Sequence, residues 1–112
     1  MRTFCNVQYE GGVCDRNIFC TGITPAQQAE ILVPATVQEW GKKVYTLASD
    51  YNNGQITAKL IQHYAKAAGA EVIQTDFFPL DVADFGATIA KIQEAAPDMI
   101  MSVLVGGAHV SF

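Results

Sequence analysis

Apolar and polar stretches alternate along the chain and predict strands and helices in turn. Residues 44–48 (VYTLA) form a nearly unbroken apolar run without period-2 alternation, which is typical of a strand covered on both faces. The polar, turn-forming residues 49–54 (SDYNNG) follow directly, and a helical pattern begins at Gln55. In open parallel sheets, ligands bind beyond the carboxyl ends of the strands. The loop at 49–54 is therefore the first place to look for a functional surface.

A strong helix start precedes this central strand. Thr24 can cap the helix, Pro25 suits its first position, and Gln27 completes a capping box. Apolar residues then recur at helical spacing as far as Gly41, and Pro34 is expected to bend this helix or open one hydrogen bond.

The other elements complete a regular alternation. Short strands are predicted within 3–8 and 18–22, a helix within 56–68, a strand at 71–78, a helix capped by Asp81 or Asp84, and a strand of the fully buried type at 99–105. This order predicts an α/β fold, a three-layer αβα sandwich with a mainly parallel sheet. The last strand lacks a covering helix, so we expect the domain to be truncated at its C-terminal end.

Composition narrows the possible functions. The chain has 112 residues, of which 50% are apolar and 16% charged, so a single globular domain is expected. A net charge of −4 without Lys/Arg clusters argues against binding nucleic acid or anionic membranes. No apolar run approaches the roughly 18 residues of a membrane span. No signal peptide is recognisable, which indicates either a cytosolic chain or part of a longer exported protein.

The residues offer no catalytic constellation. Asp50 suggests a flavodoxin-like receiver or ligand-sensing regulatory domain, but the acidic pair and the lysine that a receiver needs are missing. No glycine-rich phosphate loop occurs, and His63 and His109 have no evident partners. The three cysteines, Cys5, Cys14 and Cys20, show no metal-ligand spacing. We therefore expect neither enzyme activity nor a cofactor or metal.

Tyr51, Asn52 and Asn53 provide an aromatic ring, a hydroxyl and two carboxamides at a strand end. These groups suit a small polar ligand. They equally suit an Asx-rich turn in which Asn53 is the N-cap of the next helix. Residue types alone leave both interpretations open.

Several segments together resemble a known family, the type I periplasmic solute-binding proteins of ABC uptake systems. The branch that handles urea and short-chain amides is the most similar. The resemblance is carried in chain order by Tyr9-Glu10-Gly11-Gly12, Thr24-Pro25-Ala26-Gln27-Gln28, Gly41-Lys42-Lys43-Val44-Tyr45, Ser49-Asp50-Tyr51-Asn52-Asn53-Gly54-Gln55, Asp76-Phe77-Phe78-Pro79-Leu80, Asp84-Phe85 and the strand beginning at Asp98.

The resemblance implies a two-lobed protein that closes on its ligand like a hinge. Residues 1–17 would be the crossover segment between lobes, and residues 18–112 most of the second lobe. The parent protein would be periplasmic and would deliver urea, a short-chain amide or an amino acid to a membrane permease. The implied ligand contacts are Tyr51 and Asn53 after the central strand, and Val105 and Gly106 after the following parallel strand. Amide-binding relatives often carry an aromatic residue at the position of Asn53.

The resemblance also implies an exported parent, in which Cys14 and Cys20 could form a disulfide and Cys5 would remain free. Three reduced thiols are the open alternative. Because the strand at 99–105 would expose apolar surface, we further expect a homo-oligomer that buries the N-terminal segment or residues 99–112.

Overall fold

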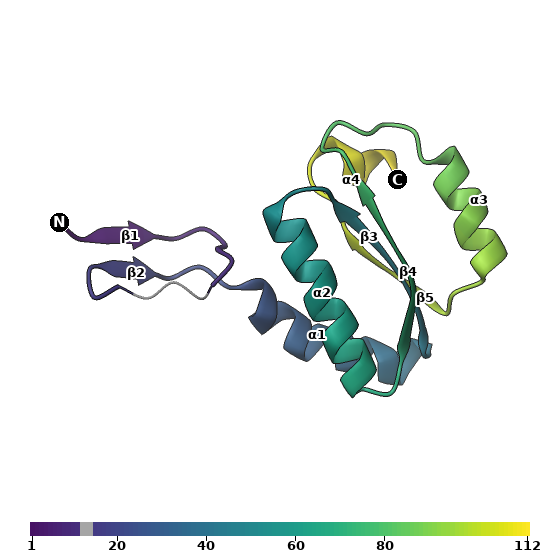
Figure 1. The fold of residues 1–112 in the computed structure, drawn as a ribbon, viewed down its shortest axis with the longest axis horizontal. Helices are drawn as coiled ribbons and strands as arrows, with labels where there is room; N and C mark the ends of the chain where they lie inside the picture. Colours follow the sequence, from purple (N-terminus) through teal and green to yellow (C-terminus); the bar gives the residue numbers. More distant parts are fainter. Residues whose placement is uncertain (12–14) are drawn as a thin grey trace.

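A two-stranded arm and an α/β body make up the chain (Figure 1). The computed structural model describes residues 1–11 and 15–112. The arm contains β1 (Thr3–Cys5) and β2 (Ile18–Cys20), which pair in parallel. The body contains α1 (Pro25–Trp40), β3 (Lys43–Ser49), α2 (Asn52–Ala67), β4 (Glu71–Phe78), α3 (Gly86–Ala95), β5 (Met99–Val103) and α4 (Gly107–Ser111).

The body is the predicted three-layer sandwich. Its sheet is parallel with strand order β4-β3-β5, so β3 is central. Helices α1 and α2 cover one face through a core that includes Val33, Val44 and Ile61. Helices α3 and α4 cover the other face through Leu47, Phe85 and other apolar residues. The α/β prediction is confirmed. No helix of the described residues is long and apolar enough to cross a membrane.

The start of α1 forms as its sequence predicts. The Gln27 N–H donates to the Thr24 hydroxyl at 3.3 Å, and the Thr24 N–H donates to Gln27 Oε1 at 2.8 Å. This reciprocal capping box satisfies two amides that the helix itself leaves unpaired. Pro34 lies within α1, which continues on both sides of it.

Two local predictions differ from the structure. The third helix is capped by neither Asp81 nor Asp84: Phe85 occupies the N-cap position, and the Asp84 carboxylate accepts from the Gly86 N–H at 2.9 Å. The expected burial of both faces of the last strand is also wrong. Exposure alternates along β5, and Ile100 is 41% exposed, because β5 is an edge strand.

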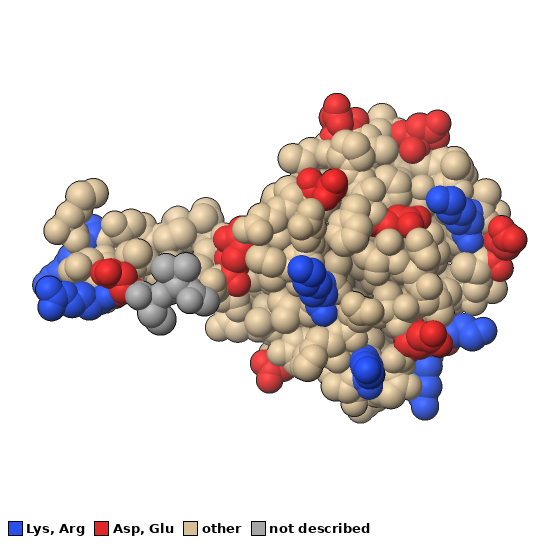
Figure 2. All heavy atoms as spheres, viewed as in Figure 1, with Lys and Arg blue, Asp and Glu red and all other residues tan. Residues whose placement is uncertain are grey.

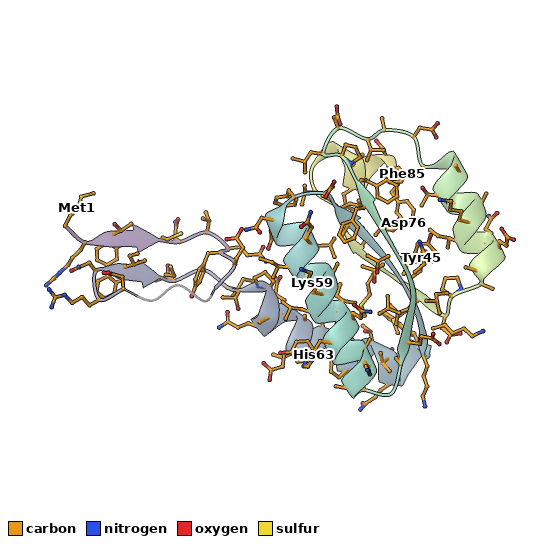
Figure 3. All side chains as sticks on the ribbon, in the orientation of Figure 1. Met1, Tyr45, Lys59, His63, Asp76 and Phe85 are labelled. Atoms are coloured by element: carbon orange, nitrogen blue, oxygen red, sulfur yellow. The ribbon has the colours of Figure 1, made fainter. Side chains whose placement is uncertain are left out.

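A polar pair lies on the α3 side of the sheet. Tyr45 is buried, and its hydroxyl donates to Asp76 Oδ2 at 2.7 Å, while Gln74 Nε2 donates to Asp76 Oδ1 at 2.8 Å. Figure 3 shows the two labelled residues side by side. Burial and then the Asp76 hydrogen bond and charge raise the pKa of Tyr45 to about 12. Partial burial opposes ionisation of Asp76, but its hydrogen bonds from Gln74 and Tyr45 and the charge of Lys91 outweigh this and lower its pKa.

The raised pKa of Tyr45 predicts an alkaline loss of stability. An unfolded tyrosine loses its proton near pH 10, whereas folded Tyr45 keeps it to about pH 12. Its contribution is therefore complete below pH 10 and is lost as the pH rises from about 10 to about 12. Over this interval, the free energy of unfolding should fall about 2 kcal/mol further in the wild type than in Tyr45→Phe. Urea unfolding at stepped pH measures this, and parallel declines in both proteins would contradict it.

Candidate functional site

The carboxyl ends of the three strands meet around Ser49. The Val105 N–H donates to Ser49 Oγ at 3.2 Å, which joins the loop after β5 to the end of β3. The Asp50 N–H donates to the Phe78 carbonyl at 2.6 Å, which joins β3 to the end of β4. Ser49 is fully buried. Ser49 was not among the predicted site residues, although it orients the loops that carry them.

Helix α2 begins directly above the end of β3, without a side-chain cap. Tyr51 is the N-cap residue, in extended conformation, and makes no capping hydrogen bond with its side chain. Asn53 is the second residue of α2, so the interpretation of Asn53 as the N-cap is wrong. The close approach requires Gly54, because a Cβ there would lie 2.0 Å from the Ser49 carbonyl oxygen. Because no side chain caps the helix, the backbone N–H groups of its first turn are free to donate hydrogen bonds to a ligand.

Asn53 carries an unsatisfied acceptor. Its Nδ2 donates to the Tyr51 hydroxyl oxygen at 3.2 Å, so these two predicted site residues are in contact. Its Oδ1 is buried and has no hydrogen-bond partner in residues 1–11 and 15–112. A buried carbonyl oxygen without a partner costs about 1–3 kcal/mol.

Two carboxylates contact side chains in the first turn of α2. Glu10 reaches the start of α2 from the segment that follows β1, and its Oε1 accepts from Asn52 Nδ2 at 3.1 Å. Asp50 Oδ1 accepts from Gln55 Nε2 at 2.8 Å. Glu10 was not predicted as a site residue; its place within Tyr9-Glu10-Gly11-Gly12 was the available signal. On the face drawn in Figure 2, the basic side chains of the body are spread singly.

Val105 and Gly106 occupy the loop between β5 and α4. The Val105 N–H is already used by Ser49, and its side chain is 36% exposed. Gly106 has φ of 59°, a left-handed conformation that favours glycine. His109 turns back on the same loop, with a ring nitrogen 3.0 Å from the Leu104 carbonyl oxygen. The loops of Tyr51 and of Val105 are therefore neighbours, linked through Ser49.

The remaining candidate residues lie elsewhere or outside the described part of the chain. Cys14 falls outside the described residues, so the Cys14–Cys20 pairing stays a prediction. Cys5 and Cys20 both lie in the arm. His63 sits midway along α2, with its ring against that of Tyr64. Among residues 1–11 and 15–112, no group of three or more His, Cys, Asp or Glu side chains could hold a metal ion.

A separate apolar groove of about 630 Å³ runs between α1 and the open side of β5. Ile31, Leu32 and Trp40 of α1 line it, together with residues 99–103. None of Tyr51, Asn53, Val105 and Gly106 borders it. The site at the strand ends and the groove are thus two distinct surfaces.

The sequence profile described as periplasmic binding protein matches residues 3–112. The chain belongs to the periplasmic binding protein family. This is a class of binding proteins and not of enzymes, which favours the binding-protein interpretation over the receiver domain. Periplasmic binding proteins of known structure resemble the chain closely in fold, whereas no curated protein matches it significantly.

Three solved structures illustrate the similarity, all of them ABC-transporter proteins from Rhodopseudomonas palustris. A solute-binding protein in complex with benzoate has a TM-score of 0.81 at 22% identity, over 88% of this chain and 28% of its own. One in complex with 4-hydroxybenzoate has a TM-score of 0.79 at 28% identity, over 86% and 26%. A branched-chain amino acid transporter protein has a TM-score of 0.72 at 23% identity, over 95% and 32%. The chain thus spans about a quarter to a third of the length of these relatives.

Proposed function

We propose that the chain is a ligand-binding lobe of an ABC-transporter solute-binding protein for a small polar solute, an amino acid or a short-chain amide such as urea. In the complete protein, residues 1–17 would be the crossover between lobes and residues 18–112 the second lobe. That protein would be periplasmic and would pass its solute to a membrane permease. The proposal rests chiefly on the buried, unpartnered Oδ1 of Asn53 at the start of α2.

The hydrogen-bonding groups around Asn53 define what the ligand must supply. Asn53 Oδ1 and the carboxylate of Glu10, which contacts the neighbouring Asn52, accept hydrogen bonds, so the solute needs an N–H or O–H donor. The open amides at the start of α2 and the Tyr51 hydroxyl proton are donors, so the solute also needs an acceptor oxygen. Amino acids and amides carry both. In this arrangement Val105 and Gly106 would line the side of the solute site next to the Tyr51 loop.

A hydroxylated aromatic acid is the second candidate. The relative bound to 4-hydroxybenzoate is 28% identical to this chain, and that ligand combines a carboxylate with a hydroxyl donor. Benzoate has the same carboxylate and ring without the donor. The two acids therefore form a matched pair for testing whether the acceptor on Asn53 selects the solute.

A titration panel of leucine, acetamide, urea, 4-hydroxybenzoate and benzoate tests the proposal. Half of a binding site should bind weakly, in the millimolar range, so the titration is best followed by NMR. We expect leucine or an amide to bind most tightly and 4-hydroxybenzoate to bind more tightly than benzoate. Benzoate binding as tightly as every donor-bearing solute would reject the donor requirement. Absence of binding by all five would reject the proposed solute classes.

We further propose that this chain, on its own, forms a homodimer through β5. In the part of the chain that the structure describes, no strand pairs with the outer edge of β5, so its peptide groups are unpaired on that side. Residues 99–103 carry no charge, and exposed Ile31, Leu32 and Trp40 flank them along the groove. An uncharged strand edge beside apolar side chains favours pairing with another strand. A second copy provides an identical edge, and two-fold pairing would close both.

Sedimentation velocity across a wide concentration range tests this association. We expect dimers at micromolar concentrations, with a blue shift of the fluorescence of Trp40, which is 59% exposed in the groove. Ile100→Lys places a charge on the edge and should yield monomers. Val110→Lys, at an exposed position of α4, should leave the dimer intact. A wild type that stays monomeric at high micromolar concentration would contradict the proposed dimer.

A further inference from the structure

The parallel pairing of the arm places two cysteines opposite each other. In the register of β1 and β2, Thr3 pairs with Ile18, Phe4 with Phe19 and Cys5 with Cys20. Paired residues of neighbouring strands lie about 4.8 Å apart and, in a parallel pair in register, project to the same side. This spacing falls within the Cα separation of about 4.4–6.8 Å that a disulfide spans.

Contacts on both sides of the cysteines fix this register. The rings of Phe4 and Phe19 stack with their centroids 5.2 Å apart, one residue before the cysteines. The Thr21 N–H donates to the Cys5 carbonyl at 2.8 Å, one residue after them. A slip by one residue would break both contacts and would place Cys5 against a non-cysteine residue. The pairing of the two cysteines therefore depends on specific neighbours.

The surroundings of the two thiols are consistent with this pairing. Both side chains are partly buried and unbridged. Desolvation, followed by the charge of Cys5 and a hydrogen bond with its side chain, raises the pKa of Cys20. Because the register already sets Cys5 opposite Cys20, no rearrangement of the strands is needed to bring the two cysteines together.

We propose that Cys5 and Cys20, in place of the Cys14–Cys20 pair that the family resemblance implies, are an oxidation site that forms a disulfide and covalently closes the arm. With glutathione disulfide as oxidant, one cysteine thiolate attacks it, forms a mixed disulfide and releases one glutathione. The second cysteine thiolate then attacks the sulfur of the first cysteine and releases the other glutathione. Two thiols lose their protons and two electrons, and glutathione disulfide is reduced to two molecules of glutathione. This inference does not depend on which solute the site binds.

The bridge would stabilise the segment that carries Glu10. The loop from Cys5 to Cys20 includes Glu10, whose carboxylate contacts Asn52 at the candidate site. A disulfide that closes a loop of about 15 residues lowers the conformational entropy of the locally unfolded segment, so the segment unfolds less often. Amide hydrogen exchange in the described residues 6–11 and 15–17 should therefore slow by about tenfold on oxidation.

Peptide mapping after oxidation with glutathione disulfide tests the pairing. Trypsin alone leaves Cys5 and Cys14 on one peptide, so cleavage after Glu10 must be added to separate them. We expect a bridge between the peptides that contain Cys5 and Cys20, with Cys14 as the one remaining free thiol. A Cys14–Cys20 bridge, a Cys5–Cys14 bridge or three free thiols would each overturn the proposal.

Single substitutions provide matched controls under the same conditions. Cys14→Ser should form the bridge to the same extent as the wild type, and Cys5→Ser should show no intramolecular bridge. Far-UV circular dichroism establishes that both variants fold. A bridge that persists in Cys5→Ser, or one that is lost in a folded Cys14→Ser, would assign the oxidation to Cys14 and overturn the proposal. Non-reducing denaturing gel electrophoresis separates any chains joined by intermolecular disulfides, so only the monomer band is mapped.

Discussion

Replacing Gly54 with alanine should lower the free energy of unfolding by about 3 kcal/mol. A Cβ at this position would lie 2.0 Å from the Ser49 carbonyl oxygen. The oxygen is part of the Ser49 backbone, and the new Cβ is bonded directly to the backbone of residue 54. No side-chain rotation can therefore relieve the overlap. The start of α2 must then move away from the end of β3, which disturbs the loop that carries Tyr51. Chemical denaturation measures the loss.

Gly107→Ala is the matched control for this substitution. A Cβ at Gly107 would have no atom within 4 Å, and alanine suits a helix at least as well as glycine. Its free energy of unfolding should therefore equal or slightly exceed that of the wild type. Equal stability of Gly54→Ala and Gly107→Ala would show that α2 does not need its close approach to β3.

Replacing Asn53 with alanine should weaken solute binding about tenfold or more without loss of stability. Asn53 Oδ1 has no partner among the described residues, so removing it relieves an unsatisfied group, which offsets the loss of the Nδ2 hydrogen bond to the Tyr51 hydroxyl. In the complex, the same removal would leave the solute donor without its acceptor, which costs about 1.5–3 kcal/mol when the donor is charged. Titration with the tightest-binding solute measures affinity, and urea unfolding measures stability.

Gln62→Ala removes a comparable carboxamide from the exposed middle of the same helix. It should change neither affinity nor stability by more than about 0.5 kcal/mol. A fall in the stability of Asn53→Ala without a change in affinity would assign Asn53 a purely structural role. The combination of weaker binding and unchanged stability is what distinguishes a ligand-binding group.

The sequence predicted the central elements well because their burial is encoded locally. The apolar run at 44–48 correctly indicated a strand covered on both faces, and Thr24 and Gln27 correctly indicated the start of α1. The run at 99–105 looks the same, yet β5 lies at the edge of the described sheet. Strand order is set by contacts between distant segments, and a single apolar run carries no information about it.

The sequence predicted where the candidate site lies, but it did not predict which residues interact there. The polar residues after β3 located it, but the roles of Ser49 and Glu10 depend on contacts across 56 and 42 residues. The unpaired Oδ1 of Asn53 depends on the orientation of one side chain. Cysteine pairing cannot be deduced from spacing either; the register of β1 and β2 is what sets Cys5 against Cys20.

Chemical-shift mapping of the ¹⁵N-labelled chain with the tightest-binding solute tests the central claim most directly. If the strand ends form half of a solute-binding site, the largest saturable shifts should occur at Asn52, Asn53 and Gly54, with smaller ones at Val105 and Gly106. The indole signal of Trp40, in the separate groove, should not move. Shifts centred on Trp40 and residues 99–103, or no saturable shifts at 49–54, would contradict the assignment of this surface as the binding site.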